Sequence, residues 1–365
     1  MKSIISWVLL CLSMTATGQE FAFNQEDWEV RAQGSVLENY KGKASLYLYN
    51  GVARLKDFEF FTGVLEYDIF VTERRGFPGI HFRIQDSGNY EEFYIRPHQS
   101  GNPDANQYTP VFNGVAAWQL YFGERFSTAY AYTVNTWNHI KMVVTEDAME
   151  VFINDMEKPM LTVGDLKHAH KSGAFEFSAG GPSGFRFANF KATKTENVRL
   201  VGEAKPIGEL PEGLIATWSV SDPFAEKSLQ GVTALNAEHK KALKWTTLDA
   251  EERGYANLSR VASRTSAQNT VFAKVIIQSD KKQVKKLFYS VSDRGTVFLN
   301  GQALVSGYNN FRAQDYRHLG TIGFHDAVYL PLKKGSNELW IAVSENFGGW
   351  GVMGAFQDPE GISVK

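Results

Sequence analysis

Cysteine is scarce in this chain: Cys11 is the only one among 365 residues. It lies in a short apolar run, residues 4–14, which follows Lys2 and precedes the small residues 16–18. This arrangement predicts an export signal over residues 1–18. Its removal would leave 347 residues (365 − 18) without cysteine, which excludes disulfides and a thiol nucleophile. We therefore expect a secreted or periplasmic protein, with a lipid anchor on Cys11 as the alternative.

An excess of one charge and long apolar runs are also lacking. The formal net charge is −2, and −3 once Lys2 is removed, so we expect neither nucleic acid nor an anionic membrane surface as the main partner. No apolar run reaches the length that a membrane span requires. A Gly-x-Ser-x-Gly motif is absent, which excludes the serine elbow of esterases. The glycine-rich residues 180–184 lack the lysine and following helix of a phosphate loop and predict a turn.

Helical periodicity is almost absent from the first half, whereas strict alternation of apolar and polar residues recurs. It occurs at residues 65–71, 80–85 and 93–98 and predicts strands with one buried face. Because short links join the three runs, we expect an antiparallel meander in which neighbours in sequence are neighbours in space. The polar face of this meander would collect Glu66, Asp68, His81, Arg83, Gln85, Tyr94, Arg96 and His98.

The segment 97–117 follows the meander and is rich in glycine, proline, asparagine and aromatic residues. A connection of this length is uncommon inside a compact domain and is usually functional or disordered. Its aromatic and apolar content favours order. A rigid sheet with a long amide-rich loop beside a polar face is a common way to build a small-ligand site.

Many short strands without intervening helices predict an all-β fold, with two β-sandwich (jelly-roll) domains in tandem. Residues 195–213 are polar, contain prolines and show no period, which is typical of a linker. The predicted division is therefore a signal at 1–18, a first domain at 19–194, the linker at 195–213 and a second domain at 214–365. Asn50-Gly51 and Asn300-Gly301 predict two tight hairpin turns.

The first half resembles the concanavalin A-like lectin and glucanase superfamily, which includes laminin G-like and 3-keto-disaccharide hydrolase-like domains. The residues that carry the resemblance are 63–68, 79–86, 136–141 and the closing strand 185–191. The resemblance implies two curved sheets whose concave face and loops receive glycans.

The second half, from about Glu212, resembles the galactose-binding-like jelly roll that accompanies β-galactosidases. Residues 297–301 and 335–343 carry this resemblance. In that family these turns shape the sandwich and do not contact sugar by themselves, and many such domains are structural accessories.

The pair Glu66 and Asp68 is the sharpest enzymatic candidate, because residues i and i+2 of a strand share a face. Glycosidases need two carboxyl groups near one bond. The laminarinase-like pattern would place a third acidic residue where this chain has Phe70 and Val71, so the proton donor is missing unless another strand supplies it. The alternative is a polar face on which these carboxylates pair with Arg83 and Arg96.

His81 and His98, with Glu66 or Asp68 nearby, are candidates for an acid/base pair or a metal site. A histidine on a sheet is more often a structural hydrogen-bonding group, so we assign no metal ligand. Asp104 to Asn106 hold part of a calcium-loop pattern without its glycine and terminal glutamate. We therefore expect no cofactor, with calcium as an open alternative.

In the second half, the loop 308–316 is aromatic and amide-rich, and Trp350 lies among glycines. Aromatic faces stack on sugars, so Tyr308, Arg312 and Trp350 are candidate ligand residues. The alternative for Trp350 is burial in the core.

We expect an exported protein that binds an oligo- or polysaccharide on the polar face and loop of the first half. The alternatives are a glycoside hydrolase that uses Glu66 or Asp68 with His81 or His98, and a non-catalytic protein-interaction scaffold. The expected ligand contacts are Arg83, Tyr94, Arg96, His98, Asn106, Gln107, Tyr108, Asn113, Trp118, Tyr308, Arg312 and Trp350.

Overall fold

The computed structural model describes residues 18–168, 171–241, 243–310 and 315–365. The predicted export signal up to residue 17, Cys11 and Arg312 therefore lie outside the described residues. Strands dominate the described chain, and the all-β prediction is confirmed. The described part holds no helix with the length and apolar character that crossing a bilayer requires.

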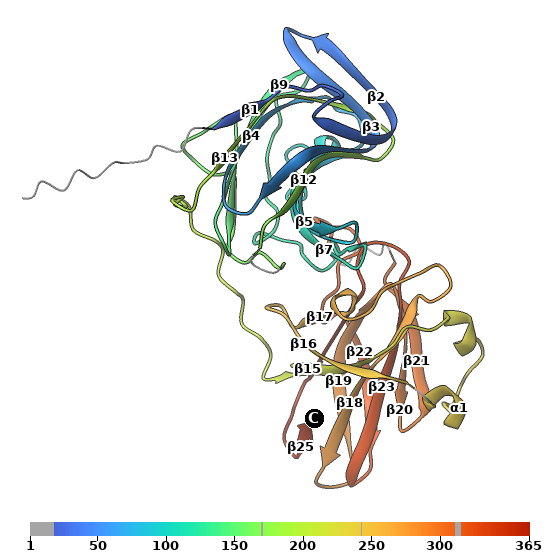
Figure 1. Ribbon diagram of the computed structural model, residues 1–365. Helices are drawn as coiled ribbons and strands as arrows, with labels where there is room; N and C mark the ends of the chain where they lie inside the picture. Colours follow the sequence, from blue (N-terminus) through green and yellow to red (C-terminus); the bar gives the residue numbers. More distant parts are fainter. Residues whose placement is uncertain (1–17, 169–170, 242, 311–314) are drawn as a thin grey trace, which may run out of the picture.

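The N-terminal half, residues 19–194, forms one curled antiparallel sheet of thirteen strands (Figure 1). Its central path runs β11-β10-β9-β4-β13-β3-β12-β5-β6-β7-β8, while β1 pairs with β13 and β2 with β3. The strands are β1 (Gln19–Phe21), β2 (Trp28–Tyr40), β3 (Lys43–Phe60), β4 (Gly63–Val71), β5 (Phe77–Asp86), β6 (Asn89–Ile95), β7 (Asn106–Phe112), β8 (Val115–Ala116), β9 (Thr136–Val144), β10 (Met149–Ile153), β11 (Leu161–Val163), β12 (Gly173–Gly180) and β13 (Phe185–Lys194), with the 3₁₀ turn η1 (Pro97–Gln99).

Alternation in these strands buries one face in an aromatic core, as the sequence predicts. Phe175 and Phe190 stack with centroids 4.5 Å apart, and Phe177 packs against Phe187 at 4.6 Å. All four side chains are fully or almost fully buried. Burial of each such ring stabilises the fold by about 1.5–3 kcal/mol.

Two expectations about strand order are wrong. The strands β4 and β5 are consecutive in sequence but are not neighbours, because β13, β3 and β12 lie between them. Asn50-Gly51 is not a hairpin turn, since β3 continues through it. At Asn50, with φ of 43°, β3 changes its neighbour from β13 to β12. A Cβ on Gly51 would lie 2.3 Å from the Ala32 Cα, which explains why this position needs glycine.

The C-terminal half forms a five-stranded and a seven-stranded sheet. Asn300 and Gly301 both have positive φ and join β20 to β21, so this predicted hairpin is confirmed. The elements are β14 (Gly213–Leu214), β15 (Thr217–Ser221), η2 (Glu226–Leu229), α1 (Ala237–Lys240), β16 (Trp245–Asp249), β17 (Tyr255–Asn257), η3 (Leu258–Arg260), β18 (Thr270–Ser279), β19 (Gln283–Ser292), β20 (Arg294–Leu299), β21 (Gln302–Tyr308), β22 (Asp326–Leu332), β23 (Gly335–Ser344), β24 (Gly351–Phe356) and β25 (Ile362–Val364).

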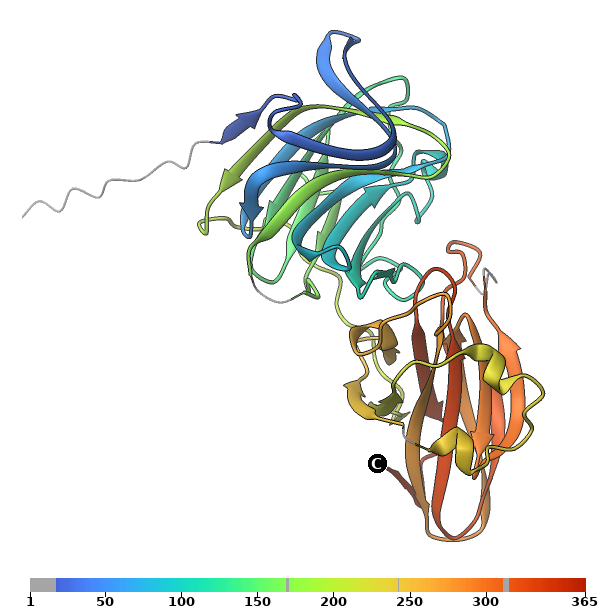
Figure 2. The ribbon, with the colours of Figure 1, turned by 45° about the vertical axis from the view of Figure 1, so that its right-hand side comes forward.

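Residues 195–212, between β13 and β14, contain no strand or helix, and the division into domains there stays a prediction. The loops of the two halves meet beside this segment (Figure 2). Tyr255, Ile322 and Met353 of the C-terminal half belong to the same apolar cluster as the N-terminal core. The Tyr121 hydroxyl donates to Glu251 Oε1 at 2.8 Å and accepts from Asn257 Nδ2 at 3.2 Å. The junction is therefore packed and hydrogen-bonded.

Candidate functional site

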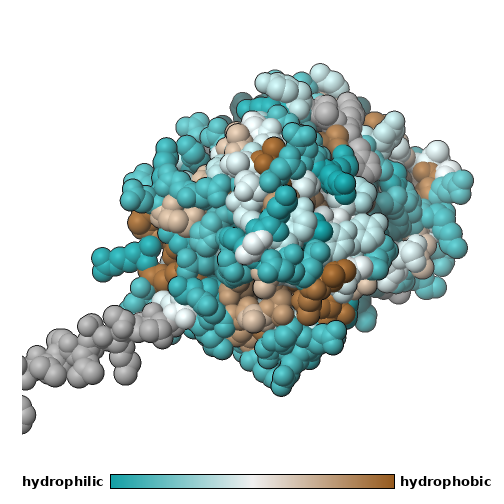
Figure 3. All heavy atoms as spheres, turned by 90° about the horizontal axis from the view of Figure 1, so that it is seen from above, coloured by the Kyte–Doolittle hydropathy of each residue, from teal (hydrophilic) through white to brown (hydrophobic). Residues whose placement is uncertain are grey.

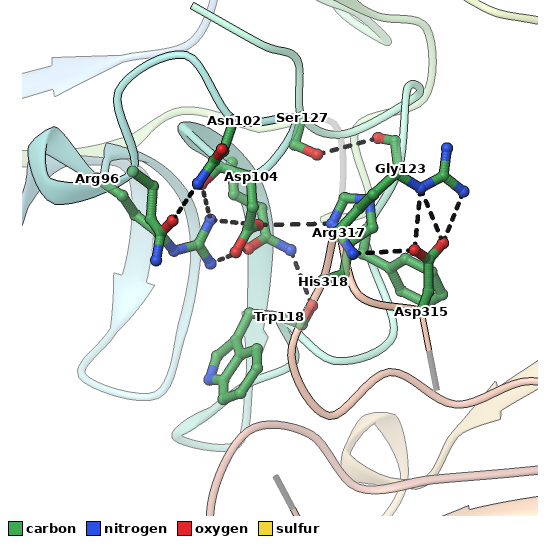
Figure 4. Close-up of polar contacts among 12 residues, drawn as sticks. Arg96, Asn102, Asp104, Trp118, Gly123, Ser127, Asp315, Arg317 and His318 are labelled. Atoms are coloured by element: carbon green, nitrogen blue, oxygen red, sulfur yellow. Dashed lines mark hydrogen bonds and ion pairs between the residues drawn. The ribbon is translucent and has the colours of Figure 1, made fainter. Parts of the chain in front are cut away.

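The loop after β6 is fixed by a buried polar network around Arg96, which is 6% exposed. Arg96 Nη1 donates to Asp104 Oδ1 at 2.7 Å, while Nη2 donates to the Tyr94 hydroxyl at 2.6 Å and to Gln107 Oε1 at 2.5 Å. The Arg96 guanidinium also lies over the Tyr94 ring. Charge-assisted bonds of this kind are strong and directional. They hold Asp104 beside His318 of the C-terminal half (Figure 4).

Two buried amides extend this scaffold to the neighbouring segment. Gln107 Nε2 donates to the carbonyls of Trp118 and Tyr121, and Asn106 Nδ2 donates to the Thr128 carbonyl at 2.8 Å. Both side chains are almost fully buried. Since buried amides are costly unless paired, these bonds specify the path of residues 118–128.

The segments that this scaffold positions form one wall of a groove of about 890 Å³ between the two halves. A volume of this size falls in the usual range for small-ligand sites. The lining is mixed in charge and rich in polar groups. It consists of Pro103, Phe122, Gly123, Glu124, Ser127, Thr128, Ala129, Glu157, Lys158, Pro159, Met160, Leu161, Thr162, Val201, Gly202, Glu203, Lys205, Arg253, Asp315, Arg317 and His318.

The opposite wall comes from the C-terminal loop 315–319, as Figure 4 shows. Arg317 pairs with Asp315 at 2.6 Å, and this hydrogen-bonded pair holds the pKa of Asp315 well below its ordinary value. His318 Nδ1 lies 3.7 Å from Asp104 Oδ1, across the junction. His318 is only 7% exposed, so the two walls approach each other closely at a buried point.

Two smaller cavities adjoin the groove and share lining residues with it. One of about 420 Å³ shares Phe122 and Arg253 with it. The Arg253 guanidinium lies 3.9 Å from the Phe122 ring centroid and donates to the Phe122 carbonyl at 2.7 Å. The second cavity, of about 190 Å³, shares Arg317 and His318 with the groove and is also lined by Tyr316, which is 94% exposed.

A separate polar cluster lies on the sheet face of β12, β5 and β6. His81 Nδ1 lies 2.8 Å from Glu176 Oε1, and His81 Nε2 lies 3.4 Å from Glu92 Oε1. Burial opposes charge on this imidazole, but the two carboxylates outweigh burial and raise the pKa of His81 to about 9. Tyr90 stacks on the His81 ring with centroids 4.4 Å apart, and Arg54 pairs with Glu176 at 2.9 Å.

The structure places Glu66 and Asp68 in a different cluster. Asp68 accepts from Lys43 Nζ and from Asn189 Nδ2, both at 2.6 Å, and its Oδ1 lies 2.8 Å from His139 Nδ1. Glu66 Oε1 lies 3.7 Å from His139 Nε2. The expected grouping of Glu66 or Asp68 with His81 or His98 is therefore wrong. Three strands separate β4 from β5, which carries His81, and His98 lies in η1 after β6. Sequence reasoning missed His139 and Glu176, whose positions opposite these residues only strand order reveals.

Several expected ligand residues turn inward. Arg83 is fully buried, with φ of 51°, and donates to the carbonyls of Phe61, Thr145 and Glu146. The expectation that Arg83 shares the open polar face is therefore wrong, because the positive φ and a register shift after Phe82 interrupt the alternation. Tyr108 is buried and donates to Glu91 at 2.7 Å. Trp350 is buried core, as the alternative predicted, and its Nε1 donates to the Val343 carbonyl.

The remaining expected residues lie apart from one another. His98 packs edge-on against Phe77, and burial and nearby Arg75 and Arg96 lower its pKa. Asn113 donates to the Ser259 carbonyl at 2.8 Å, and Trp118 packs against Phe347, so both belong to the junction. Tyr308 is 67% exposed and lines another cavity beside Glu226 and Arg294.

Within the described ranges, no three His, Cys, Asp or Glu side chains gather as a metal site. Asp104, which belongs to the partial calcium-loop pattern, is engaged by Arg96. Apolar groups on the upper face form separate patches on a mostly hydrophilic surface (Figure 3).

No protein-family model and no curated protein matches the chain. Solved structures match about half of it. A carbohydrate binding module of Bacillus subtilis is 14% identical and covers 46% of this chain and 96% of its own, with a TM-score of 0.35. A Bacillus licheniformis β-glucanase is 12% identical over 49% of this chain and 99% of its own, with a TM-score of 0.36. A Flavobacterium laminarinase is 10% identical over 48% of this chain and 99% of its own, with a TM-score of 0.37. These values are too low to carry a functional argument.

Proposed function

We propose that this protein binds carbohydrate, and that an oligosaccharide occupies the groove between the two halves. The observation that carries the proposal is the groove itself, about 890 Å³ with a polar and charged lining, together with an exposed tyrosine in an adjoining cavity. Of the segment predicted to form the site, Pro103 lines the groove. The polar sheet face is a weaker candidate, because the charges of His81 and Glu176 are already paired with each other.

Carbohydrate fits the chemistry of this lining. Sugar hydroxyls both donate and accept hydrogen bonds, and the groove offers carboxylates, ammonium groups and hydroxyls in one place. Glu157 and Lys158 approach it from the N-terminal half, and Arg317 approaches from the other wall. The flat face of Tyr316 can stack on the C–H face of a sugar ring at low entropic cost. An apolar small molecule would leave these polar groups desolvated and unpaired.

A glycan array with the whole protein, followed by calorimetric titration of any glycan that binds, tests the proposal. We expect Tyr316→Ala and Arg317→Ala each to weaken binding about tenfold or more, which corresponds to about 1.4 kcal/mol. The matched control is Tyr329→Ala, because Tyr329 is a 66% exposed tyrosine on β22 and does not line the groove. Absence of glycan binding by a folded protein, or an equal loss in the control, would overturn the proposal.

The His81 cluster supports a second candidate function, a carbohydrate-active enzyme with His81 as general acid. A cationic imidazole within 3.4 Å of two carboxylates is an arrangement that can donate a proton and take one back. The test is release of reducing sugar from polysaccharide mixtures by the wild type, by Glu176→Gln and by Glu66→Gln. Activity that is lost in the first variant and retained in the second would support this function. Activity that is equal in all three would exclude the cluster.

A further inference from the structure

Two buried carboxylates lie at the end of the C-terminal sandwich that faces the N-terminal half. Asp293 precedes β20 and Glu345 follows β23, two strands that pair at Arg294 and Ser344. Both side chains are fully buried. Asp293 Oδ2 accepts from the N–H groups of Asn346 and Phe347 at 2.9 and 3.2 Å, and Glu345 Oε1 accepts from Gly349 N–H at 3.3 Å. The backbone of residues 345–349 thus holds one oxygen of each carboxylate.

The other oxygen of each carboxylate has no hydrogen-bond partner among the described residues. Asp293 Oδ1 and Glu345 Oε2 are both buried and unpaired, and so are the amide oxygens of Asn309 and Asn310. Asn309 is adjacent, because its N–H donates to the Asp293 carbonyl at 2.7 Å. Its Nδ2 donates to the Ser290 hydroxyl and to the Val291 carbonyl. Asn309 is only 3% exposed, and its Oδ1 has no partner among the described residues. Native interiors rarely leave so many acceptors unpaired in one region.

Among the described residues, no cationic side chain forms an ion pair with Asp293 or Glu345. The Arg294 guanidinium is held by both oxygens of Glu226, at 2.7 and 2.8 Å. Arg264 is close enough to favour the charged form of both carboxyls, but the described residues show no ion pair between them, and Arg264 Nε is itself unpaired. Burial, together with the charge of Asp293, raises the pKa of Glu345 to about 9.

We propose that Asp293 and Glu345 bind a divalent cation, with Ca²⁺ as the ion that fits, assisted by the amide oxygens of Asn309 and Asn310. The four unpaired oxygens belong to carboxylates and amides, and Ca²⁺ takes six to eight oxygen ligands in flexible geometry. The lack of imidazole and thiolate disfavours zinc and other softer metals. A divalent ion neutralises both carboxylates and satisfies the unpaired acceptors together.

The ion would also stabilise the junction. The turn that carries Glu345 contacts the N-terminal half, since Gln119 N–H donates to the Gly348 carbonyl at 2.8 Å. Ser292, next to Asp293, donates to Gln119 Oε1 at 2.8 Å. A cation that fixes residues 345–349 therefore fixes one side of the contact between the halves. This proposal is independent of carbohydrate binding.

Thermal unfolding and calorimetric titration of the chelator-treated, whole protein with CaCl₂ test the site. We expect saturable binding of one ion and an increase in Tm of several degrees, with a smaller increase in MgCl₂. Asp293→Asn and Glu345→Gln should lose most of the calcium-dependent increase. The control Asp358→Asn removes a C-terminal carboxylate that pairs with Lys285, and it should keep the increase.

The two variants keep the shape of the side chains, and circular dichroism verifies their fold. If the wild type neither binds calcium nor gains stability, or if both variants respond as the wild type does, the proposal is wrong. A Glu345→Gln protein that keeps its fold and no longer responds to calcium would support it, because the amide replaces one of the two carboxylate ligands.

Discussion

Replacing His81 by glutamine should reduce stability at low pH and leave little effect at high pH. The folded protein raises the pKa of His81 from 6.5 to about 9, against the opposing effect of burial. A histidine whose pKa is higher in the folded protein contributes its full stabilisation at pH values below the pKa of the unfolded chain. This contribution is lost as the pH rises through the pKa of the folded protein. The window is therefore pH 6.5 to about 9. The difference between the two values corresponds to about 3 kcal/mol, since one pKa unit is worth 1.36 kcal/mol.

Urea unfolding of the wild type and His81→Gln between pH 6 and pH 10 measures this contribution. We expect the difference in unfolding free energy to be about 3 kcal/mol at pH 6 and to shrink steadily above pH 7. His139→Gln is the matched control: its pKa is also raised to about 9, by Asp68 first and then Glu66, but its side chain is 38% exposed. Solvent screening should therefore make its effect clearly smaller. A pH-independent difference for His81→Gln would refute the reasoning, because it would show lost packing in place of a lost charge.

Three further substitutions test the core, the bend in β3 and the buried amide network. Trp350→Ala should cost about 3–5 kcal/mol by chemical denaturation, because the indole is fully buried, whereas a ligand-stacking tryptophan would tolerate the change. Gly51→Ala should lower Tm markedly, since the new Cβ would lie 2.3 Å from the Ala32 Cα; an unchanged Tm would contradict the bend in β3. Gln107→Leu removes the hydrogen bonds to the Trp118 and Tyr121 carbonyls. We expect amide hydrogen exchange in residues 118–128 to be faster than in the wild type, whereas exchange in β10 should stay unchanged.

Strand positions could be predicted from the sequence, because alternation is a local property. The Asn300-Gly301 hairpin was likewise predictable, since both residues adopt the positive φ that this turn needs. Asn50 also has positive φ, yet it bends a continuous strand. A local preference for positive φ therefore does not distinguish a turn from a bend, and tertiary pairing decides between them.

The neighbours of each strand could not be predicted in the same way. The alternation of side chains places Glu66 and Asp68 on one face of β4. It does not predict that β9 pairs with β4 and places His139 opposite Asp68. Similarly, Glu176 reaches His81 because β12 pairs with β5 across 95 residues of sequence. The chemistry of both clusters depends on this long-range pairing, so short sequence spacing could not have identified either one.

The expectation of one long loop over residues 97–117 is wrong, because β7 and β8 form within this segment. Of residues 97–117, Pro103 lines the groove, whereas the side chains of Arg96, Asn106 and Gln107 are buried and hold the backbone of neighbouring segments. Polar residues that the sequence places near a site have two possible roles, contact with the ligand or support of the loop that contacts it. Burial separates these roles, since a side chain under 10% exposed with all its donors bonded has nothing left to offer a ligand. The groups that remain free belong to segments from both halves, so only folding and docking of the two halves assemble the groove.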